Sequence, residues 1–159
     1  RLYTALKIFS VSFWALTLYL WYTKDIRLAL LGVGTISNGI SLSIFWWAQN
    51  YTKNKNFSVV FGKDIPQTIE TNGPYKFVRH PFYTSYLFCY MATAIVFLSP
   101  LLFLNFLGLL ALYLIAIKIE ESKFIRSEHI TRFVEYRSKT GALIPKIKQS
   151  RDRSLKKAN

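Results

Sequence analysis

The sequence predicts an all-α, polytopic membrane protein with about four transmembrane helices in two hairpins and a C-terminal amphipathic cytosolic helix. The 159 residues are 52% hydrophobic and 17% aromatic, which is high for a small soluble protein. Four apolar segments approach the roughly 20 residues that cross a bilayer core. The basic residues behind the net charge of +13 lie mostly outside these segments. This distribution indicates the lipid bilayer as partner, and no nucleic acid.

The four expected spans cover residues 6–22, 26–48, 82–98 and 101–119. The first two are joined by the very short linker Thr23-Lys24-Asp25, and the last two by the turn pair Ser99-Pro100. Short connections between apolar runs are typical of antiparallel neighbours, so each pair is expected to form a hairpin. The second span is rich in glycine and serine and carries Asn38, so we expect it to face other helices and to give Asn38 a polar partner.

Charge distribution predicts how the chain lies across the membrane. Most of the 21 lysines and arginines fall in the loop 49–81 or after residue 117, whereas Lys24 and Arg27 stand on the opposite side. The positive-inside rule therefore places this loop, the C-terminus and the N-terminus in the cytoplasm. The membrane itself is expected to be a bacterial or archaeal inner membrane or the endoplasmic reticulum.

The C-terminal part is predicted to be a helix over residues 120–139 followed by a solvated basic tail over 148–159. The helix is amphipathic, and it is expected either to lie on the membrane surface or to fold back under the loop. Thr140-Gly141 ends the helix, and a short apolar patch follows. Residues 1–147 are expected to form a single domain. Cys89 is the chain's single cysteine, and no Cys/His spacing typical of a metal site occurs, so no metal is expected.

Ionisable side chains gather at the two ends of the second predicted hairpin. The segment 73–83 packs two prolines, a glycine, an Arg-His pair and four aromatic residues at the start of the third span, and Glu120-Glu121 ends the fourth. Because the two helices form a hairpin, these ends are neighbours. Paired carboxylates at a membrane boundary mark a functional site. Adjacent helical positions point about 100° apart, so one glutamate is expected to face inward.

Simpler interpretations exist for the same residues. Pro81 suits the first turn of a helix, and Arg79 suits a headgroup anchor. The two glutamates would then balance Lys118 and Lys123 on the surface. These interpretations explain single residues but not the whole run from Gly73 to Tyr83.

Several motifs in a fixed order carry a resemblance to a known family. They are Gln67-Thr68-Ile69-Glu70-Thr71-Asn72-Gly73-Pro74-Tyr75, Val78-Arg79-His80-Pro81-Phe82-Tyr83 and Glu120-Glu121. Together they resemble the isoprenylcysteine carboxyl methyltransferase family and its phospholipid-methyltransferase relatives, over roughly residues 45–147. Each motif alone would be weak, and the ordered combination is specific.

The resemblance implies an integral membrane enzyme that moves a methyl group from S-adenosylmethionine to a lipid-associated acceptor and releases S-adenosylhomocysteine. It implies a donor site at the cytosolic helix ends, capped by the C-terminal region. The residues implied to bind the donor are Gln67, Thr68, Ile69, Glu70, Tyr75, His80, Pro81, Phe82, Tyr83 and Glu120. Catalytic roles are implied for Arg79, His80 and Glu121. These residue types suit the donor, because a sulfonium favours aromatic faces and carboxylates, and a carboxylate favours His or Arg.

The acceptor class stays open at this point. An isoprenylcysteine-like carboxylate is already a nucleophile, whereas a phospholipid-like amine must first lose a proton to a base such as His80 or Glu121. Three departures from the family pattern bear on the site: Gln67 replaces a common His, Ser85 a common Gly, and Ala116 an Arg that the prenylcysteine enzymes use for the substrate carboxylate. The last departure argues against assuming a prenylcysteine substrate.

Two other functions fit parts of the sequence. A membrane reductase of the sterol or steroid type shares a related Arg-His-Pro-x-Tyr element but uses NADPH, and thermal-shift titration with the two cofactors would distinguish it. A non-enzymatic adaptor would hold anionic lipids with the basic tail. The adaptor gives the Arg-His-Pro cluster no role, and Gly73-Pro74-Tyr75 with the paired glutamates favours the methyltransferase.

Overall fold

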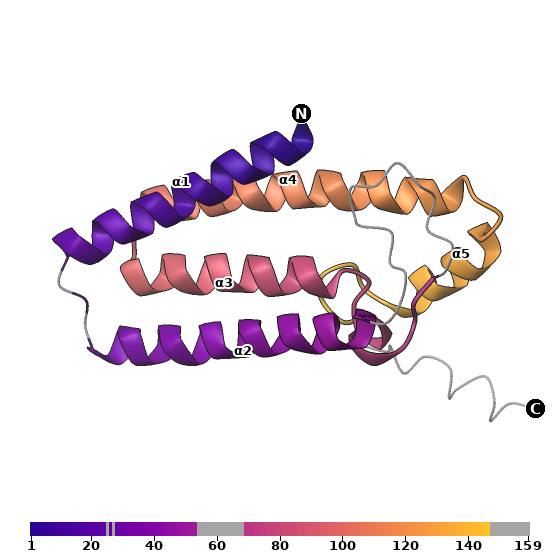
Figure 1. The fold of residues 1–159 in the computed structure, drawn as a ribbon, viewed down its shortest axis with the longest axis horizontal. Coiled ribbons are helices and arrows are strands. Elements are labelled where there is room, and N and C mark those ends of the chain that lie inside the picture. Colours follow the sequence, from indigo (N-terminus) through magenta and orange to yellow (C-terminus); the bar gives the residue numbers. More distant parts are fainter. Residues whose placement is uncertain (25, 27, 54–68, 147–159) are drawn as a thin grey trace, which may run out of the picture.

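A computed structural model describes residues 1–24, 26, 28–53 and 69–146, and this part of the chain is helical, without strands. The helices are α1 Leu2–Thr23, α2 Leu28–Thr52, the short 3₁₀ helix η1 Gly73–Lys76, α3 Pro81–Phe97, α4 Pro100–Ile125 and α5 Ile130–Lys139 (Figure 1). The predicted all-α class is confirmed. The predicted basic tail 148–159 and residues 54–68 of the loop 49–81 lie outside the described residues.

Three of the described helices, α1, α2 and α4, are long and apolar enough to cross a membrane. The predicted third span corresponds to α3, which is apolar but has only 17 residues. At 1.5 Å per residue it is about 25 Å long, somewhat less than the roughly 30 Å hydrocarbon core. The chain is therefore an integral membrane protein with three clear spanning helices and one shorter apolar helix beside them.

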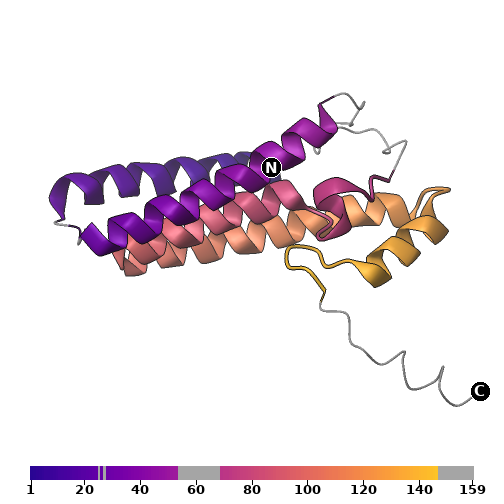
Figure 2. The ribbon, with the colours of Figure 1, turned by 90° about the horizontal axis from the view of Figure 1, so that it is seen from below.

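The helices α2, α3 and α4 run side by side, and α1 lies across α4 on one face of the α3–α4 pair (Figures 1 and 2). The predicted turn between the third and fourth spans is confirmed, since Leu98 adopts the left-handed conformation that ends α3 and Ser99 precedes Pro100 at the start of α4. The first two helices are also antiparallel and joined by a short linker. However, α1 packs mainly on α4, whereas α2 packs on α3.

Small residues explain which helices pack together. A Cβ atom at Gly34 of α2 would lie 2.4 Å from Val96 Cγ2 of α3, and the Ser41 hydroxyl donates a 2.6 Å hydrogen bond to the Ser85 carbonyl. The expectation that the second span faces another helix is confirmed along this stripe. The polar partner expected for Asn38 is not found, because its buried Oδ1 accepts no hydrogen bond from the described residues.

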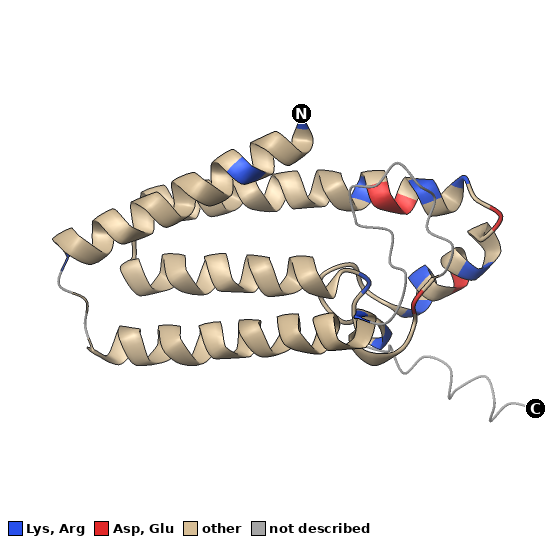
Figure 3. Cartoon of the chain, viewed as in Figure 1, with Lys and Arg blue, Asp and Glu red and all other residues tan. Residues whose placement is uncertain are grey.

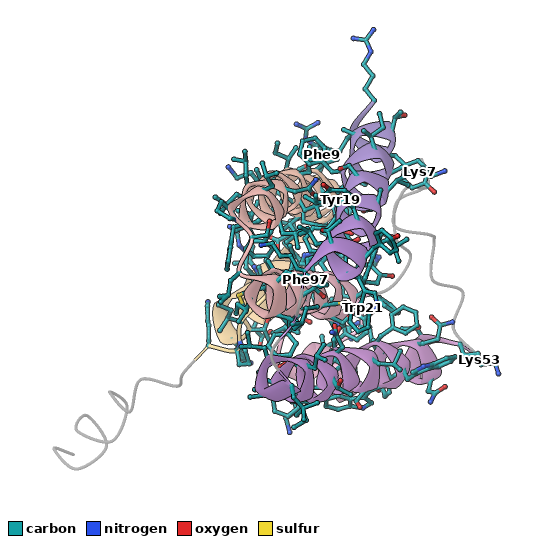
Figure 4. All side chains as sticks on the ribbon, turned by 90° about the vertical axis from the view of Figure 1, so that its left-hand side faces the viewer. Lys7, Phe9, Tyr19, Trp21, Lys53 and Phe97 are labelled. Carbon is teal, nitrogen blue, oxygen red and sulfur yellow. The ribbon has the colours of Figure 1, made fainter. Side chains whose placement is uncertain are left out.

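Apolar side chains cover the outside of the bundle as well as its interior. Phe13, Leu102 and Leu109 are fully buried. At one end of α1 the Phe9 ring fills the space over Gly108 of α4, and at the other end Trp21 lies 6.4 Å from Phe97 of α3 (Figure 4). Many large apolar side chains are exposed on the outer face; they include Ile8, Val11, Leu18, Val33, Ile36, Leu101, Leu104 and Leu107. Such a continuous apolar surface suits lipid rather than water.

Charged residues concentrate at one end of the bundle, where α2 and α4 finish, α3 begins and α5 packs (Figure 3). We call this the polar end. The opposite end, at the α1–α2 connection, carries Lys24 directly after the last residue of α1. This uneven distribution of charge is typical of a membrane protein whose charged residues lie mainly on one side of the bilayer. The assignment of the polar end to the cytoplasm stays a prediction.

The predicted helix over 120–139 is wrong in its continuity. The helix α4 runs through Ile125, and α5 begins only at Ile130. The turn between them is stabilised by Ser127, whose hydroxyl donates to the Phe124 carbonyl and accepts the His129 amide. The rings of Phe124 and Phe133 then stack at 5.0 Å. Consequently α5 folds back toward the loop, the second of the two arrangements expected for it.

Candidate functional site

The residues before α3 are held by a segment from the far end of the sequence. Pro81 occupies the first position of α3, and a proline disfavours helical geometry in the residue before it, so His80 is non-helical. The amides of Arg79 and His80 donate to the carbonyls of Gly141 and Ala142 at 2.9 and 3.1 Å. The Thr84 hydroxyl lies 2.9 Å from the carbonyl oxygen of Leu143 and donates to it. We call residues 140–143 the C-terminal strap.

The buried side chain of Glu121 is surrounded by cationic groups. Arg79 Nε donates to Glu121 Oε1 at 2.7 Å, and both side chains are only 8% exposed. The Arg79 guanidinium also donates through Nη1 to the Thr140 carbonyl of the strap. From α5, Arg137 Nε lies 3.5 Å from Glu121 Oε2. One carboxylate on α4 therefore joins the start of α3, the strap and α5.

The His80 imidazole lies between the two glutamates. Its Nδ1 is 3.4 Å from Glu120 Oε2 and its Nε2 is 3.4 Å from Glu121 Oε1. The Tyr83 hydroxyl donates to Glu120 Oε1, and the Tyr83 ring stacks on the imidazole at 5.5 Å. The expectation that one glutamate faces inward is wrong: both contact His80. Adjacent residues of α4 point in different directions, but the imidazole has two ring nitrogens. Its Nδ1 therefore contacts Glu120 while its Nε2 contacts Glu121.

Electrostatics favour a protonated His80. Burial on its own lowers the pKa of the imidazole, but the hydrogen bonds from Glu120 and Glu121, together with their charges, outweigh this and raise the pKa above its ordinary value. A neutral imidazole has one N–H, so only the imidazolium donates to both carboxylates. The cluster then holds a positively charged imidazole close to two negatively charged carboxylates, and all three side chains are largely buried.

Beside this cluster, the end of the loop packs against α5. The Tyr136 hydroxyl donates to the Tyr75 carbonyl at 2.6 Å, and Ile69 packs with Phe133 and Tyr136 in a small core. Burial raises the pKa of the Tyr75 phenol well above its usual range, and the nearby Tyr136 and the Glu70 and Glu120 carboxylates add to the increase. Tyr75 is therefore a neutral phenol next to the cluster.

Gly73 fixes the other side of the loop end. Its φ of 57° lies in the left-handed region, and a Cβ atom there would lie 2.6 Å from the Tyr51 ring of α2. Further along, Phe77 lies 5.9 Å from Trp47. The Gly-Pro-Tyr motif thus packs under the end of α2 and leads directly to Arg79.

Of the residues predicted for the site, the structure brings five into one cluster: Arg79, His80, Tyr83, Glu120 and Glu121. Ile69 and Tyr75 lie in the adjacent contact with α5. Pro81 is fully buried at the start of α3, Phe82 packs on Phe45 of α2 at 5.5 Å, and the Glu70 carboxylate accepts the Asn72 amide at 3.0 Å. Gln67 and Thr68 lie outside the described residues. The roles of all these residues stay predictions.

Two departures from the family pattern have clear structural settings. Ser85 is fully buried at the α2–α3 contact, where its carbonyl accepts the Ser41 hydroxyl, so the close approach of the helices is kept. Ala116 is buried in the bundle core, while Lys118 is exposed on α4. Sequence reasoning missed the C-terminal strap, Thr84 and Arg137. The apolar patch after Thr140-Gly141 was the available signal, because apolar residues beyond a helix end need a surface to pack on.

Comparison with known proteins agrees with the sequence resemblance. A family model described as phospholipid methyltransferase matches residues 28–129, about two thirds of the chain. The match includes α2, α3 and α4 and all five clustered residues, and it ends before α5 and the C-terminal strap. A search of curated proteins found no match. The chain thus belongs to the phospholipid methyltransferase family, the membrane methyltransferases that act on lipids.

Proposed function

We propose that the chain transfers the methyl group of S-adenosylmethionine to a lipid-associated acceptor at the polar end of its helical bundle. The observation that carries the proposal is the buried cluster of Arg79, His80, Tyr83, Glu120 and Glu121, which joins the start of α3 to the end of α4. Ionisable groups at a membrane boundary are expensive to bury, and they mark reaction sites and ligand sites in membrane proteins.

The side chains of the cluster fit the chemistry of the methyl donor. When bound, S-adenosylmethionine supplies an electrophilic methyl group on a sulfonium sulfur. Tyr75 and Tyr83 offer aromatic faces for a cation, and Glu120 offers a carboxylate. Glu120 is 16% exposed, twice the exposed fraction of Glu121, so it is the more accessible of the two carboxylates. Arg79 and His80 suit the carboxylate of the donor.

The contacts support different roles for the two glutamates. Glu121 is engaged by Arg79, His80 and Arg137, so we assign it the positioning of these cationic groups. Glu120 is engaged by His80 and Tyr83 and has no guanidinium partner among the described residues. We therefore propose that Glu120 contacts the methyl donor and accepts the proton of an amine acceptor.

His80 is less suited to act as a base than the sequence alone indicated. A base must be unprotonated at the working pH, whereas two carboxylates hold a proton on this imidazole. We propose that His80 orients the two glutamates. A carboxylate acceptor would need no base, and an amine acceptor would use Glu120. Methyl transfer is an in-line displacement, so the main task of these residues is to align the reactants and exclude water.

The proposal is tested by transfer of labelled methyl from S-adenosylmethionine to lipids extracted from membranes that contain the protein. We expect Glu120→Gln to lower transfer by about 100-fold or more, as loss of a well-placed electrostatic contact does. The matched control is Glu128→Gln, because the Glu128 side chain is 87% exposed and should leave transfer unchanged. Undiminished transfer by Glu120→Gln would remove Glu120 from the site.

A thermal-shift titration separates the proposed donor from a nicotinamide cofactor, because a ligand stabilises the fold that it binds. We expect S-adenosylhomocysteine to raise the unfolding temperature of the purified protein in detergent and NADPH to leave it unchanged. The reverse result would point to a reductase.

A further inference from the structure

Arg137 reaches the ionic cluster from α5, a helix that lies beyond the residues matched by the family model. Its Nε is 3.5 Å from Glu121 Oε2, yet its side chain is 53% exposed. Arg79 contacts the same carboxylate but is 8% exposed and also donates to the strap through Nη1. Among the described residues, Glu121 is the one partner of the Arg137 side chain. Its terminal amino groups are therefore available at the solvent edge.

The backbone around Arg137 is held in place by two contacts. The neighbouring Tyr136 hydroxyl donates to the Tyr75 carbonyl at 2.6 Å, which fixes α5 on the loop end. Lys146 Nζ donates to the carbonyls of Arg137 and Ser138 at 2.8 and 2.9 Å, which caps the last turn of α5. These contacts fix the backbone at Arg137, so a ligand that binds the guanidinium has to order the side chain alone.

Two guanidinium groups, from Arg79 and Arg137, share the single carboxylate of Glu121. Arg79 is buried and also donates to the strap, whereas Arg137 is the exposed one of the pair. A guanidinium that uses only Nε for one carboxylate still presents its planar fork, which matches the two oxygens of a phosphate or carboxylate.

We propose that Arg137 binds the oxyanion of a ligand at this site, either the phosphodiester of the acceptor lipid or the carboxylate of the methyl donor. The choice of these two ligands rests on the proposed function, but oxyanion binding itself does not require methyl transfer.

Calorimetric titration of the purified full chain in nonionic detergent tests the proposal with three probes. S-adenosylhomocysteine carries the carboxylate, dihexanoylphosphatidylglycerol carries a phosphodiester, and dihexanoylglycerol carries neither. We expect Arg137→Gln to weaken binding of one oxyanion probe about tenfold, and Arg137→Lys to weaken it less. The probe affected identifies the source of the oxyanion, and binding of dihexanoylglycerol should not change.

Arg132→Gln is the matched control, because Arg132 is an exposed basic residue on the same helix and the substitution removes the same charge. It should leave all three affinities unchanged. The proposal is overturned if neither oxyanion probe binds the unmodified protein, if Arg137→Gln binds both as well as the unmodified protein does, or if Arg132→Gln causes an equal loss. The two proposals can fail separately. If the unmodified protein transfers no methyl group but binds the phosphodiester probe, and Arg137→Gln weakens that binding, the proposed function is contradicted and this inference is supported.

Discussion

The apolar bundle and the polar end of this protein are held together by different forces. In the bundle, helices meet through small residues and rings, as at Gly34 with Val96 and Gly108 with Phe9. At the polar end, segments 42 and 61 residues apart in sequence are joined by directional bonds, as from Arg79 to Glu121 and to Thr140. The stability of the bundle therefore depends on how closely its side chains pack, whereas the stability of the polar end depends on each buried charged group keeping its hydrogen-bond and ion-pair partners.

The physical reason lies in the surroundings of each region. Lipid tails are as apolar as the side chains they touch, so helix association in a bilayer relies on close packing rather than on removal of apolar surface from water. Buried ions behave differently, because removing one partner leaves another charge uncompensated. Substitutions should therefore have graded effects in the bundle and abrupt effects in the cluster.

The largest effect is expected for Glu121→Ala. The substitution removes the carboxylate partner of the buried Arg79 guanidinium and one of the two carboxylates that contact His80, so we expect the free energy of unfolding to fall by about 3–5 kcal/mol. Unfolding in detergent by heat or denaturant measures this. Glu128→Ala, at an exposed position on the α4–α5 turn, should be neutral. Equal stability of the two variants would mean that the cluster does not hold the polar end together.

A smaller loss is expected when a methyl group is added to the strap. A Cβ atom at Gly141 would lie 1.7 Å from the carbonyl oxygen of Ile144, so the backbone that holds Arg79 and His80 must shift. We expect Gly141→Ala to lower the free energy of unfolding by about 1–3 kcal/mol and to lower methyl transfer. In the bundle, Gly34→Ala meets the side chain of Val96 and should weaken the α2–α3 contact.

Gly32→Ala is the control for both glycine substitutions, because no atom lies within 4 Å of a Cβ at that position. Its stability should match that of the unmodified protein. If Gly141→Ala also unfolds at the unmodified temperature and keeps full activity, the strap does not position the site.

Thr84→Val tests the link between α3 and the strap. Valine keeps the shape of threonine but removes the hydroxyl, which lies 2.9 Å from the Leu143 carbonyl oxygen and 3.1 Å from the His80 carbonyl oxygen, so the expected loss is about 0.5–1.5 kcal/mol. In the bundle, Thr35 is exposed and its hydroxyl bonds within α2 to the Leu31 carbonyl. Thr35→Val should therefore change stability little. A larger loss at position 35 than at 84 would reverse the comparison.

The smallest effect is expected from pH, and it should arise at the polar end alone. The pKa of His80 is raised above its unfolded value of 6.5, so its stabilising contribution is complete below pH 6.5 and is lost as the pH rises through the folded-state pKa. Burial raises the pKa of Glu121, but its hydrogen bonds and ion pairs with His80 and Arg79 outweigh this and lower the pKa below its ordinary value, so this carboxylate stays ionised over the range. The unfolding temperature should fall as the pH rises above 6.5. The plot of unfolding temperature against pH should be flatter for His80→Gln. His129→Gln, at the chain's other histidine, should leave the curve unchanged.

The meeting of the polar residues was predictable because hairpin geometry sets it. Ser99-Pro100 joins two apolar runs of similar length, so the start of α3 must lie beside the end of α4, and His80 must approach Glu120 and Glu121. Both glutamates were predicted site residues, but only one was expected to face inward, since helix periodicity describes one helix and not the width of a ring that contacts two carboxylates.

The sequence pattern did not predict the contacts that form because α5 folds back toward the loop. Residues 126–129 are all polar, and a short polar stretch is as compatible with the exposed face of a continuous helix as with a turn, so the pattern neither marks the Ser127 turn nor brings Arg137 to Glu121. The partner of α1 was hidden for a similar reason: linker length predicts that α1 and α2 are antiparallel, but the fit of Phe9 over Gly108 decides that α1 packs on α4.

Donor binding tests the central claim most directly, because it does not depend on knowing the acceptor. Calorimetry would measure the affinity of S-adenosylhomocysteine for the purified protein, for Glu120→Gln and for Glu128→Gln. We predict equal affinities for the unmodified protein and Glu128→Gln, and at least a tenfold weaker affinity for Glu120→Gln. Equal affinities for all three proteins would contradict the assignment of the α3–α4 cluster as the donor site.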